Sequence, residues 1–163
     1  MMRKLSEIFE DHKGPPVIVE GIIRELGILL DKKAVLDPEI SGQIERVDDT
    51  FKISANKSDH YFRQRFTMAH ELGHYLYHSD LIEEGVDDNR AFRSTPEGRF
   101  YNTKIGSREE TQANRFAASI LMPKSLVEPM WIQLQDVERM AKKFQVSYTA
   151  MKIRLKSLGI NTD

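Results

Sequence analysis

Two spacings of apolar residues alternate along the chain, one typical of helices and one typical of strands. In residues 15–30 apolar side chains recur at steps of three and four, after two prolines and with Gly27 near the end, which predicts a short amphipathic helix. Residues 41–56 alternate apolar and polar positions on either side of residues 48–50, which predicts a β-hairpin. The first third of the chain is therefore expected to hold one helix and two paired strands.

The longest apolar stripe lies in the middle of the chain. From residue 59 to about residue 79, steps of four and three predict one long helix with a buried face formed by Phe62, Phe66, Ala69, Gly73 and Leu76. Residues 83–106 are polar, contain Gly and Pro, and show no sustained period. We expect a long loop there, with one short strand near residues 90–93.

The last third of the chain has helical spacing. Residues 107–123 predict a helix that stops before Pro123, and two further helices are expected at 136–144 and 147–158. The prediction is one α+β domain over residues 1–163, with a small antiparallel β-sheet packed on one side by helices. Residues 136–158 are expected to form a helical, helix-turn-helix-like subdomain within it.

Composition limits the chemistry that this domain can carry. The chain has 163 residues and a net charge of −1, so no overall field attracts it to nucleic acid or to a membrane. It has no cysteine, so a metal site must use His, Asp or Glu. No run approaches 18 apolar residues and the first residues lack a signal-peptide pattern, so we expect a cytoplasmic protein with no membrane partner.

The chemistry is concentrated in the stretch TMAHELGHYLYH of the long predicted helix. His70 and His74 are four residues apart and share one face, so their imidazoles can converge on one zinc ion. Glu71 is rotated by about 100° around the helix, where it can take a proton from water on the metal without sharing the ion. This is the physical content of the pattern H-E-x-x-H.

His78 and Gly73 need separate interpretations. His78 lies about 12 Å along the helix axis from His70, too far for both to bind one ion, so we expect a structural role at the helix end. The alternative is a solvated stripe of histidines, but the surrounding helix is apolar. Gly73 costs about 1 kcal/mol against Ala inside a helix, which indicates close approach by another backbone or by substrate.

A third ligand is sought in the next helix. Glu110 and Asn114 share a face, so Glu110 can ligate while Asn114 hydrogen-bonds a ligand histidine. Two alternatives stay open. Ser107 and Glu110 match a capping box, in which Glu110 would only satisfy the helix start, and Glu109 is a neighbouring carboxylate on another face.

At this point the sequence resembles the ImmA/IrrE family of bacterial zinc metallopeptidases. HELGHYLYH followed some thirty residues later by ETQANRFAASILMP carries the resemblance, and PVIVEGIIRELGI, ISGQI and AKKFQVSYTAMKIRL extend it. The resemblance implies His70, His74 and Glu110 as ligands of one Zn²⁺ per chain, although Mn²⁺ also suits them, and Glu71 as general base. Many relatives have a second acid where this chain has Gln112, which favours Glu110 as the ligand.

The resemblance also implies a substrate, a helix-turn-helix repressor of the Xre or phage type, often encoded nearby. The alternative is a non-proteolytic toxin or regulatory partner that keeps the zinc site. Three roles are open for residues 136–158. They could form a two-helix cap over the core, a surface that docks a repressor through Lys152, Arg154 and Lys156, or a DNA contact. The near-zero net charge does not favour DNA contact. Sequence alone leaves four candidates for oxyanion stabilisation, namely Tyr61, Tyr77, Tyr101 and Arg115.

Overall fold

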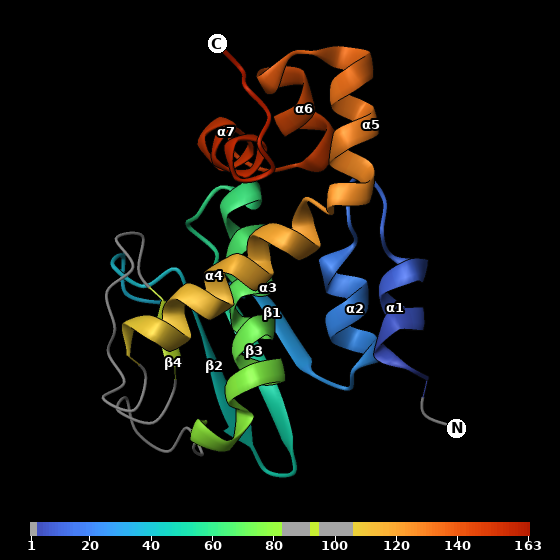
Figure 1. Ribbon diagram of the computed structural model, residues 1–163. Helices are drawn as coiled ribbons and strands as arrows, with labels where there is room; N and C mark the ends of the chain where they lie inside the picture. Colours follow the sequence, from blue (N-terminus) through green and yellow to red (C-terminus); the bar gives the residue numbers. More distant parts are fainter. Residues whose placement is uncertain (1–2, 83–91, 95–105) are drawn as a thin grey trace.

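Helix α3 (Tyr61–His78) is the central element of the fold, with the sheet on one side and other helices on the other (Figure 1). The computed structural model describes residues 3–82, 92–94 and 106–163. The expected long helix at 59–79 is therefore confirmed. Of the expected loop at 83–106, residues 83–91 and 95–105 lie outside the described residues.

The sheet has four strands in the order β1-β3-β2-β4. Strands β2 (Gly42–Val47) and β3 (Thr50–Asn56) form the predicted hairpin, with Ile44 opposite Ile53 in the core. Strand β4 (Phe92–Ser94) adds to β2 close to the predicted short strand. The prediction of an α+β fold is confirmed.

The sheet is mixed, so the prediction of an antiparallel sheet was wrong in one strand. Strand β3 lies between β2 and β1 in the sheet. It is antiparallel to β2 but runs parallel to β1 (Leu29–Ala34). The sequence prediction placed residues 15–30 in a single helix. Helix α2 instead covers Val19–Glu25, and Gly27, with φ of +77°, turns the chain into the strand.

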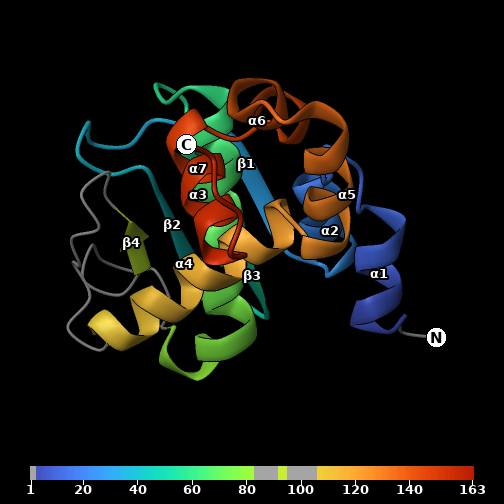
Figure 2. The same cartoon turned by 45° about the horizontal axis from the view of Figure 1, so that its top comes forward.

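The remaining helices cover the other face of α3. Helix α4 (Ser107–Leu121) crosses α3, and the views in Figures 1 and 2 agree on this placement. Helix α1 (Leu5–Asp11) packs beside α2, and the single turn η1 (Ser79–Leu81) follows α3. Within the described ranges, no helix is long and apolar enough to cross a membrane.

The C-terminal part consists of α5 (Lys124–Leu134), α6 (Val137–Phe144) and α7 (Tyr148–Ser157). The two helices expected at 136–144 and 147–158 are present, whereas α5 was not predicted. Gln145, between α6 and α7, has φ of +53°, the left-handed conformation that glycine favours at such a turn. The subdomain character of residues 136–158 stays a prediction.

One buried arginine links these parts. Arg65 of α3 is 1% exposed and donates hydrogen bonds to the backbone carbonyls of Val17, Phe144 and Gln145. A single hydrophobic core also runs through the sheet, α2, α3, α4, α6 and α7. The C-terminal helices are therefore fixed against α3 both by apolar packing and by a buried guanidinium.

Candidate metal centre

Two buried histidines face the same point from successive turns of α3. His70 and His74 are 4% and 1% exposed, and their Nε2 atoms lie 3.1 Å apart. At this distance the two nitrogen atoms either share a hydrogen bond or bind the same ion. They are separated as two ligands of one ion would be.

The carboxylate of Glu110 in α4 completes a triangle with them. Its Oε2 lies 3.0 Å from Nε2 of His70, and its Oε1 lies 3.0 Å from Nε2 of His74. Zinc binds nitrogen and oxygen at about 2.0–2.2 Å in tetrahedral geometry, which puts neighbouring ligands about 3.3 Å apart. The three residues form a buried group that could hold a metal ion, and a tetrahedral ion would keep one position open.

The histidine tautomers also suit metal binding. Nδ1 of His70 lies 2.7 Å from Oδ1 of Asn114. An amide oxygen only accepts, so Nδ1–H of His70 donates and Nε2 presents a lone pair to the centre. This contact confirms that Asn114 hydrogen-bonds His70, a candidate ligand.

A longer chain of hydrogen bonds fixes His74. Nε2 of His78 lies 2.9 Å from Oε1 of Gln112, and Nδ1 of His78 lies 2.9 Å from Nδ1 of His74. His78 must donate to the amide oxygen through Nε2–H, so its Nδ1 accepts from Nδ1–H of His74. Nε2 of His74 then carries no hydrogen and faces the centre. His78, expected only to be structural, orients a candidate ligand.

The electrostatics of the centre favour a cation. Burial raises the pKa of Glu110. His70 and His74 donate hydrogen bonds to it when their Nε2 atoms carry protons, and these bonds outweigh burial and lower that pKa to about 2. Burial lowers the pKa of His70, yet hydrogen bonding to Glu110 and the charges of Glu71 and Glu110 raise it overall. Burial dominates at His74 and lowers its pKa. Glu110 is therefore ionised, and a metal ion could take the place of the protons on the two Nε2 atoms.

Glu71 belongs to the same buried region. It is fully buried on α3, and its charge acts on His70, as the direction of the His70 pKa shift requires. It is not among the three residues whose ligand atoms converge. The geometry thus separates Glu71 from the group that could hold the ion.

The start of α4 decides between the open alternatives for Glu110. The N-cap is Gly106, and its N–H donates to Oε2 of Glu109 at 3.1 Å. Glu109 therefore satisfies the helix start, where its hydrogen bonds with backbone N–H groups lower its pKa. The capping role expected as an alternative for Glu110 falls one residue earlier, and Glu110 faces the histidines.

Gly73 allows the two helices to meet. A Cβ atom at Gly73 would lie 3.2 Å from Cα of Ala113 and 3.1 Å from a ring carbon of Phe116. These distances are tighter than ordinary contacts, so any larger side chain would push α4 away. The expected close approach of another backbone is confirmed, and it brings Glu110, one turn before Ala113, within reach of the histidines.

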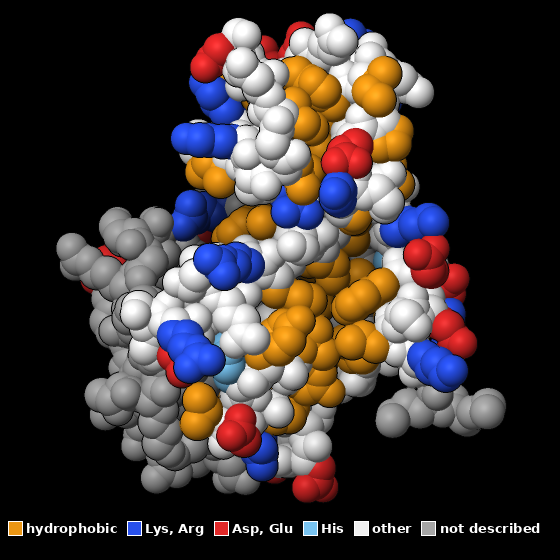
Figure 3. All heavy atoms as spheres, in the orientation of Figure 1, with side chains coloured by type: hydrophobic (Ala, Val, Ile, Leu, Met, Phe, Trp, Pro, Cys, Tyr) orange, Lys and Arg blue, Asp and Glu red, His pale blue; other side chains and the backbone are white. Residues whose placement is uncertain are grey.

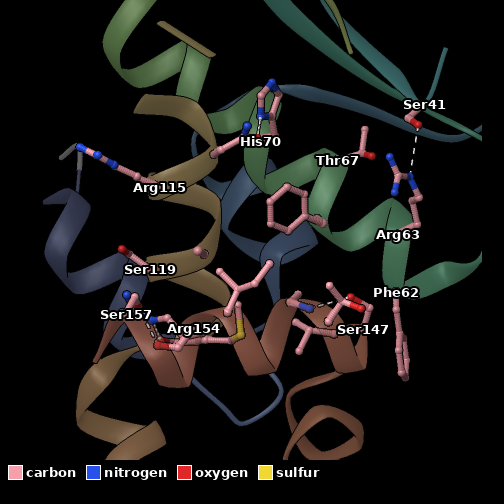
Figure 4. A pocket seen from close by; sticks show the side chains of 18 of the residues that line it. Ser41, Phe62, Arg63, Thr67, His70, Arg115, Ser119, Ser147, Arg154 and Ser157 are labelled. Carbon is pink, nitrogen blue, oxygen red and sulfur yellow. Dashed lines mark hydrogen bonds between the residues drawn. The ribbon is translucent and has the colours of Figure 1, made fainter. Parts of the chain in front are cut away.

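The centre opens into a groove of about 1200 Å³ between α3, α4 and α7, lined at one end by His70 and Glu110 (Figure 4). Among the oxyanion candidates, Arg115 lines this groove. The hydroxyl of Tyr61 donates to Glu20, and Tyr77 packs against Phe116. Tyr101 lies outside the described residues.

Sequence reasoning missed three features of the site, namely the contact between His78 and His74, the contact between Gln112 and His78, and the groove. The contact between His78 and His74 had a signal, since the two are four residues apart on one face. Gln112 and the groove had none, because both depend on how α4 and α7 are placed in space.

A long helix with H-E-x-x-H and a glutamate from a second helix define the metallopeptidase-like class of domain. The family model described as peptidase family M78, the IrrE N-terminal-like domain, matches residues 41–156. The chain belongs to this family. No curated protein matches the chain significantly.

Among solved structures, a Mycobacterium tuberculosis transcriptional regulator is similar in fold, with a TM-score of 0.63 and 20% sequence identity. The similarity covers 93% of this chain and 44% of the regulator. The chain thus spans less than half the length of that protein.

Proposed function

We propose that the chain is a zinc-dependent endopeptidase. The observation that carries the proposal is the convergence of His70, His74 and Glu110 within 3.0–3.1 Å of one another, in a chain whose family is a peptidase family. When bound there, zinc would polarise the scissile carbonyl and lower the pKa of water towards about 7. Manganese is the alternative ion for this donor set.

Glu71 is proposed as the general base. It lies one residue from His70, is fully buried, and influences that histidine electrostatically. A carboxylate shielded from bulk water can take a proton from the attacking water and pass it to the leaving amine. Asn114 and His78 hold His70 and His74 in the tautomers that the ion needs.

The proposed substrate is a helix-turn-helix transcriptional repressor, cleaved in a flexible linker where the backbone can extend. The family resemblance supports this substrate, and so does the groove, which continues from the centre along α7. Direct DNA binding is not part of the proposal, because the net charge is −1.

A second candidate is a non-proteolytic regulatory or toxin-like partner that keeps the metal site. The similarity to a transcriptional regulator favours it, since that protein is described by regulation and not by hydrolysis. Co-incubation of purified protein with a repressor encoded nearby separates the two. Cleavage by wild type but not by Glu71→Gln supports the peptidase. Binding without cleavage would favour the regulatory partner.

The metal assignment is tested with two neighbouring glutamates. Glu110→Gln should lower zinc affinity by more than the roughly 10–100-fold typical of residues that only support a ligand. Glu109→Gln is the matched control and should keep both the metal and the helix cap, because its amide oxygen can still accept from the N–H of Gly106. Elemental analysis and chelator competition measure both. Equal zinc binding in wild type and Glu110→Gln would contradict the assignment.

A further inference from the structure

The groove that leads from the metal centre has an apolar floor. Its apolar lining comes from α3, α4 and the residue after it, α7 and the turn before α7. It consists of Phe62, Phe66, Ala118, Met122, Val146, Ala150 and Ile153. Ile153 lines this groove and is 64% exposed. An apolar side chain left in water beside a candidate active site indicates a binding surface for another apolar group.

Three arginines flank this floor. Figure 4 shows Arg63 to one side of His70, and Arg115 and Arg154 to the other. Among the described residues, none of the three forms an ion pair with a carboxylate. The one acidic side chain in the lining is Glu110, which is engaged with the two histidines.

Among the described residues, the side chains of Arg154 and Arg63 each make a single hydrogen bond, which leaves N–H groups for a bound anion. Arg154 is half-buried, its Nε–H donates to the carbonyl of Met122, and burial lowers the pKa of its guanidinium. Arg63 is exposed and makes one long contact, 3.4 Å, with the hydroxyl of Ser41. Figure 3 shows that Lys and Arg side chains gather along the junction of α4 with the C-terminal helices.

We propose that this groove binds an extended polypeptide stretch whose acidic residues flank an apolar centre, with Arg63, Arg115 and Arg154 selecting the acidic residues. The proposal rests on the proposed peptidase function, because the groove would present this stretch to the metal centre. It names the chemistry of the cleaved segment, which the function alone leaves open.

A polypeptide fits the groove better than a nucleic acid does. Grooves for single-stranded nucleic acid combine positive charge with several aromatic platforms on which bases stack. Here Phe66 and Phe62 are the aromatic side chains other than His60 and His70, and the rest of the floor is aliphatic. Carboxylates can pair with the guanidinium groups of the lining, and apolar side chains can pack on its aliphatic floor.

The same helix supplies a matched control. Lys152 and Lys156 are exposed on α7 and carry the same positive charge as the groove arginines, but neither lysine lines the groove. Of the three basic residues expected to dock a repressor, only Arg154 lines it. Removing the lysines therefore changes the net charge of α7 without changing the proposed contacts.

The experiment measures peptide binding by fluorescence anisotropy. The protein is the zinc-loaded full chain carrying Glu71→Gln, which should not cleave the probe. The probe is a fluorescein-labelled peptide with two aspartates on each side of a Leu-Ala-Leu centre. One control peptide has asparagines in place of the aspartates, and another has serines in place of the leucines. A labelled 20-nucleotide single-stranded DNA is the competing class of ligand.

The expected result is tightest binding of the aspartate peptide, weakened by salt because exposed ion pairs are screened. Arg63→Gln with Arg115→Gln should weaken it about fivefold to tenfold, from two exposed ion pairs. Lys152→Gln with Lys156→Gln should stay within about twofold. Circular dichroism and zinc content confirm that each variant is folded and loaded.

Three outcomes would overturn the proposal: equal binding of the aspartate and asparagine peptides, equal losses in the arginine and lysine variants, or tighter binding of the DNA. The proposed function fails separately. If the peptide binds as expected but wild type hydrolyses neither it nor a repressor, the groove stands and the peptidase does not. If wild type and the Arg63→Gln with Arg115→Gln variant cleave a repressor at the same rate, the peptidase function is supported and the proposed role of the groove is wrong.

Discussion

Helix α3 carries two buried polar features, Arg65 and, less than two turns further on, His70 of the candidate metal centre. Their polar atoms face different kinds of partner. Arg65 directs its N–H groups at three backbone carbonyls that cannot move away. His70, His74 and Glu110 instead direct nitrogen and oxygen atoms at one another. Donors facing fixed acceptors make a structural link, whereas lone pairs facing one point make a site for a cation.

The difference teaches how to read a buried charge. Both groups are almost wholly shielded from water, so burial alone does not separate them. The direction of their partners does. A link of the Arg65 type is complete within the protein. The histidine group could hold a metal ion. Substitutions at Arg65 should therefore lower stability, whereas substitutions at the candidate metal centre should lower metal binding or hydrolysis.

The largest effect is expected for Glu71→Gln. The amide is almost the same size but cannot take a proton, so hydrolysis should fall by about 10²–10⁴. Zinc content should be unchanged, because Glu71 is not among the converging ligand atoms. Cleavage of the cognate repressor and elemental analysis measure the two. Retained hydrolysis would move the proton transfer to another residue.

Arg65→Met tests the structural side of the comparison. It removes donors from three buried carbonyls, so stability should fall by about 3 kcal/mol. Zinc content per folded chain should stay the same. Arg63→Met, two residues away and exposed, is the control and should change stability by less than about 0.5 kcal/mol. Urea denaturation measures the free energy of unfolding of both variants. Equal losses would show that the buried hydrogen bonds of Arg65 do not stabilise the fold more than an exposed arginine does.

Sequence patterns predicted the elements that depend on neighbours along the chain. The hairpin, α3, α4, α6 and α7 were all expected, since their periods and their stop signals are local. Strand β1 was missed, because an apolar run such as residues 28–30 suits both a helix end and a buried strand. Helix α5 was missed, and it contains Pro129 in its interior.

The same division holds for the candidate site. His70, Glu71 and His74 follow from one helical spacing, and Gly73 pointed to the close approach that brings Glu110 to them. Arg65 gave no signal, because its three acceptors come from residues 48 to 80 positions away. The choice between Glu109 and Glu110 needed the true N-cap of α4, which is Gly106 and not Ser107, the residue that the capping-box alternative assumed.

His78→Ala gives the next smaller effect and tests whether the site depends on its supporting contacts. His78 fixes the tautomer of His74, so its loss should weaken zinc binding by about 10–100-fold. Gln112→Leu removes the acceptor behind His78 and should weaken it less. Gln112→Glu keeps an acceptor and should bind zinc at least as well as wild type. Chelator competition ranks the four proteins, and equal affinities would leave His78 with packing alone.

The smallest effect concerns Glu20, a buried carboxylate that, like Arg65, is satisfied inside the protein. Burial raises its pKa, but the hydrogen bond from the hydroxyl of Tyr61 and the charges of Lys32 and Arg65 lower it overall. A folded pKa below the unfolded one stabilises the protein above the unfolded pKa, and this contribution is lost as the pH falls through the folded pKa. Tyr61→Phe should therefore cost about 1 kcal/mol at pH 7. The gap from wild type should close as the pH falls from the ordinary glutamate range through the lowered pKa of Glu20. Urea denaturation across this range measures the gap. A gap that stays constant with pH would mean that Tyr61 stabilises α3 through packing and not through the charge of Glu20.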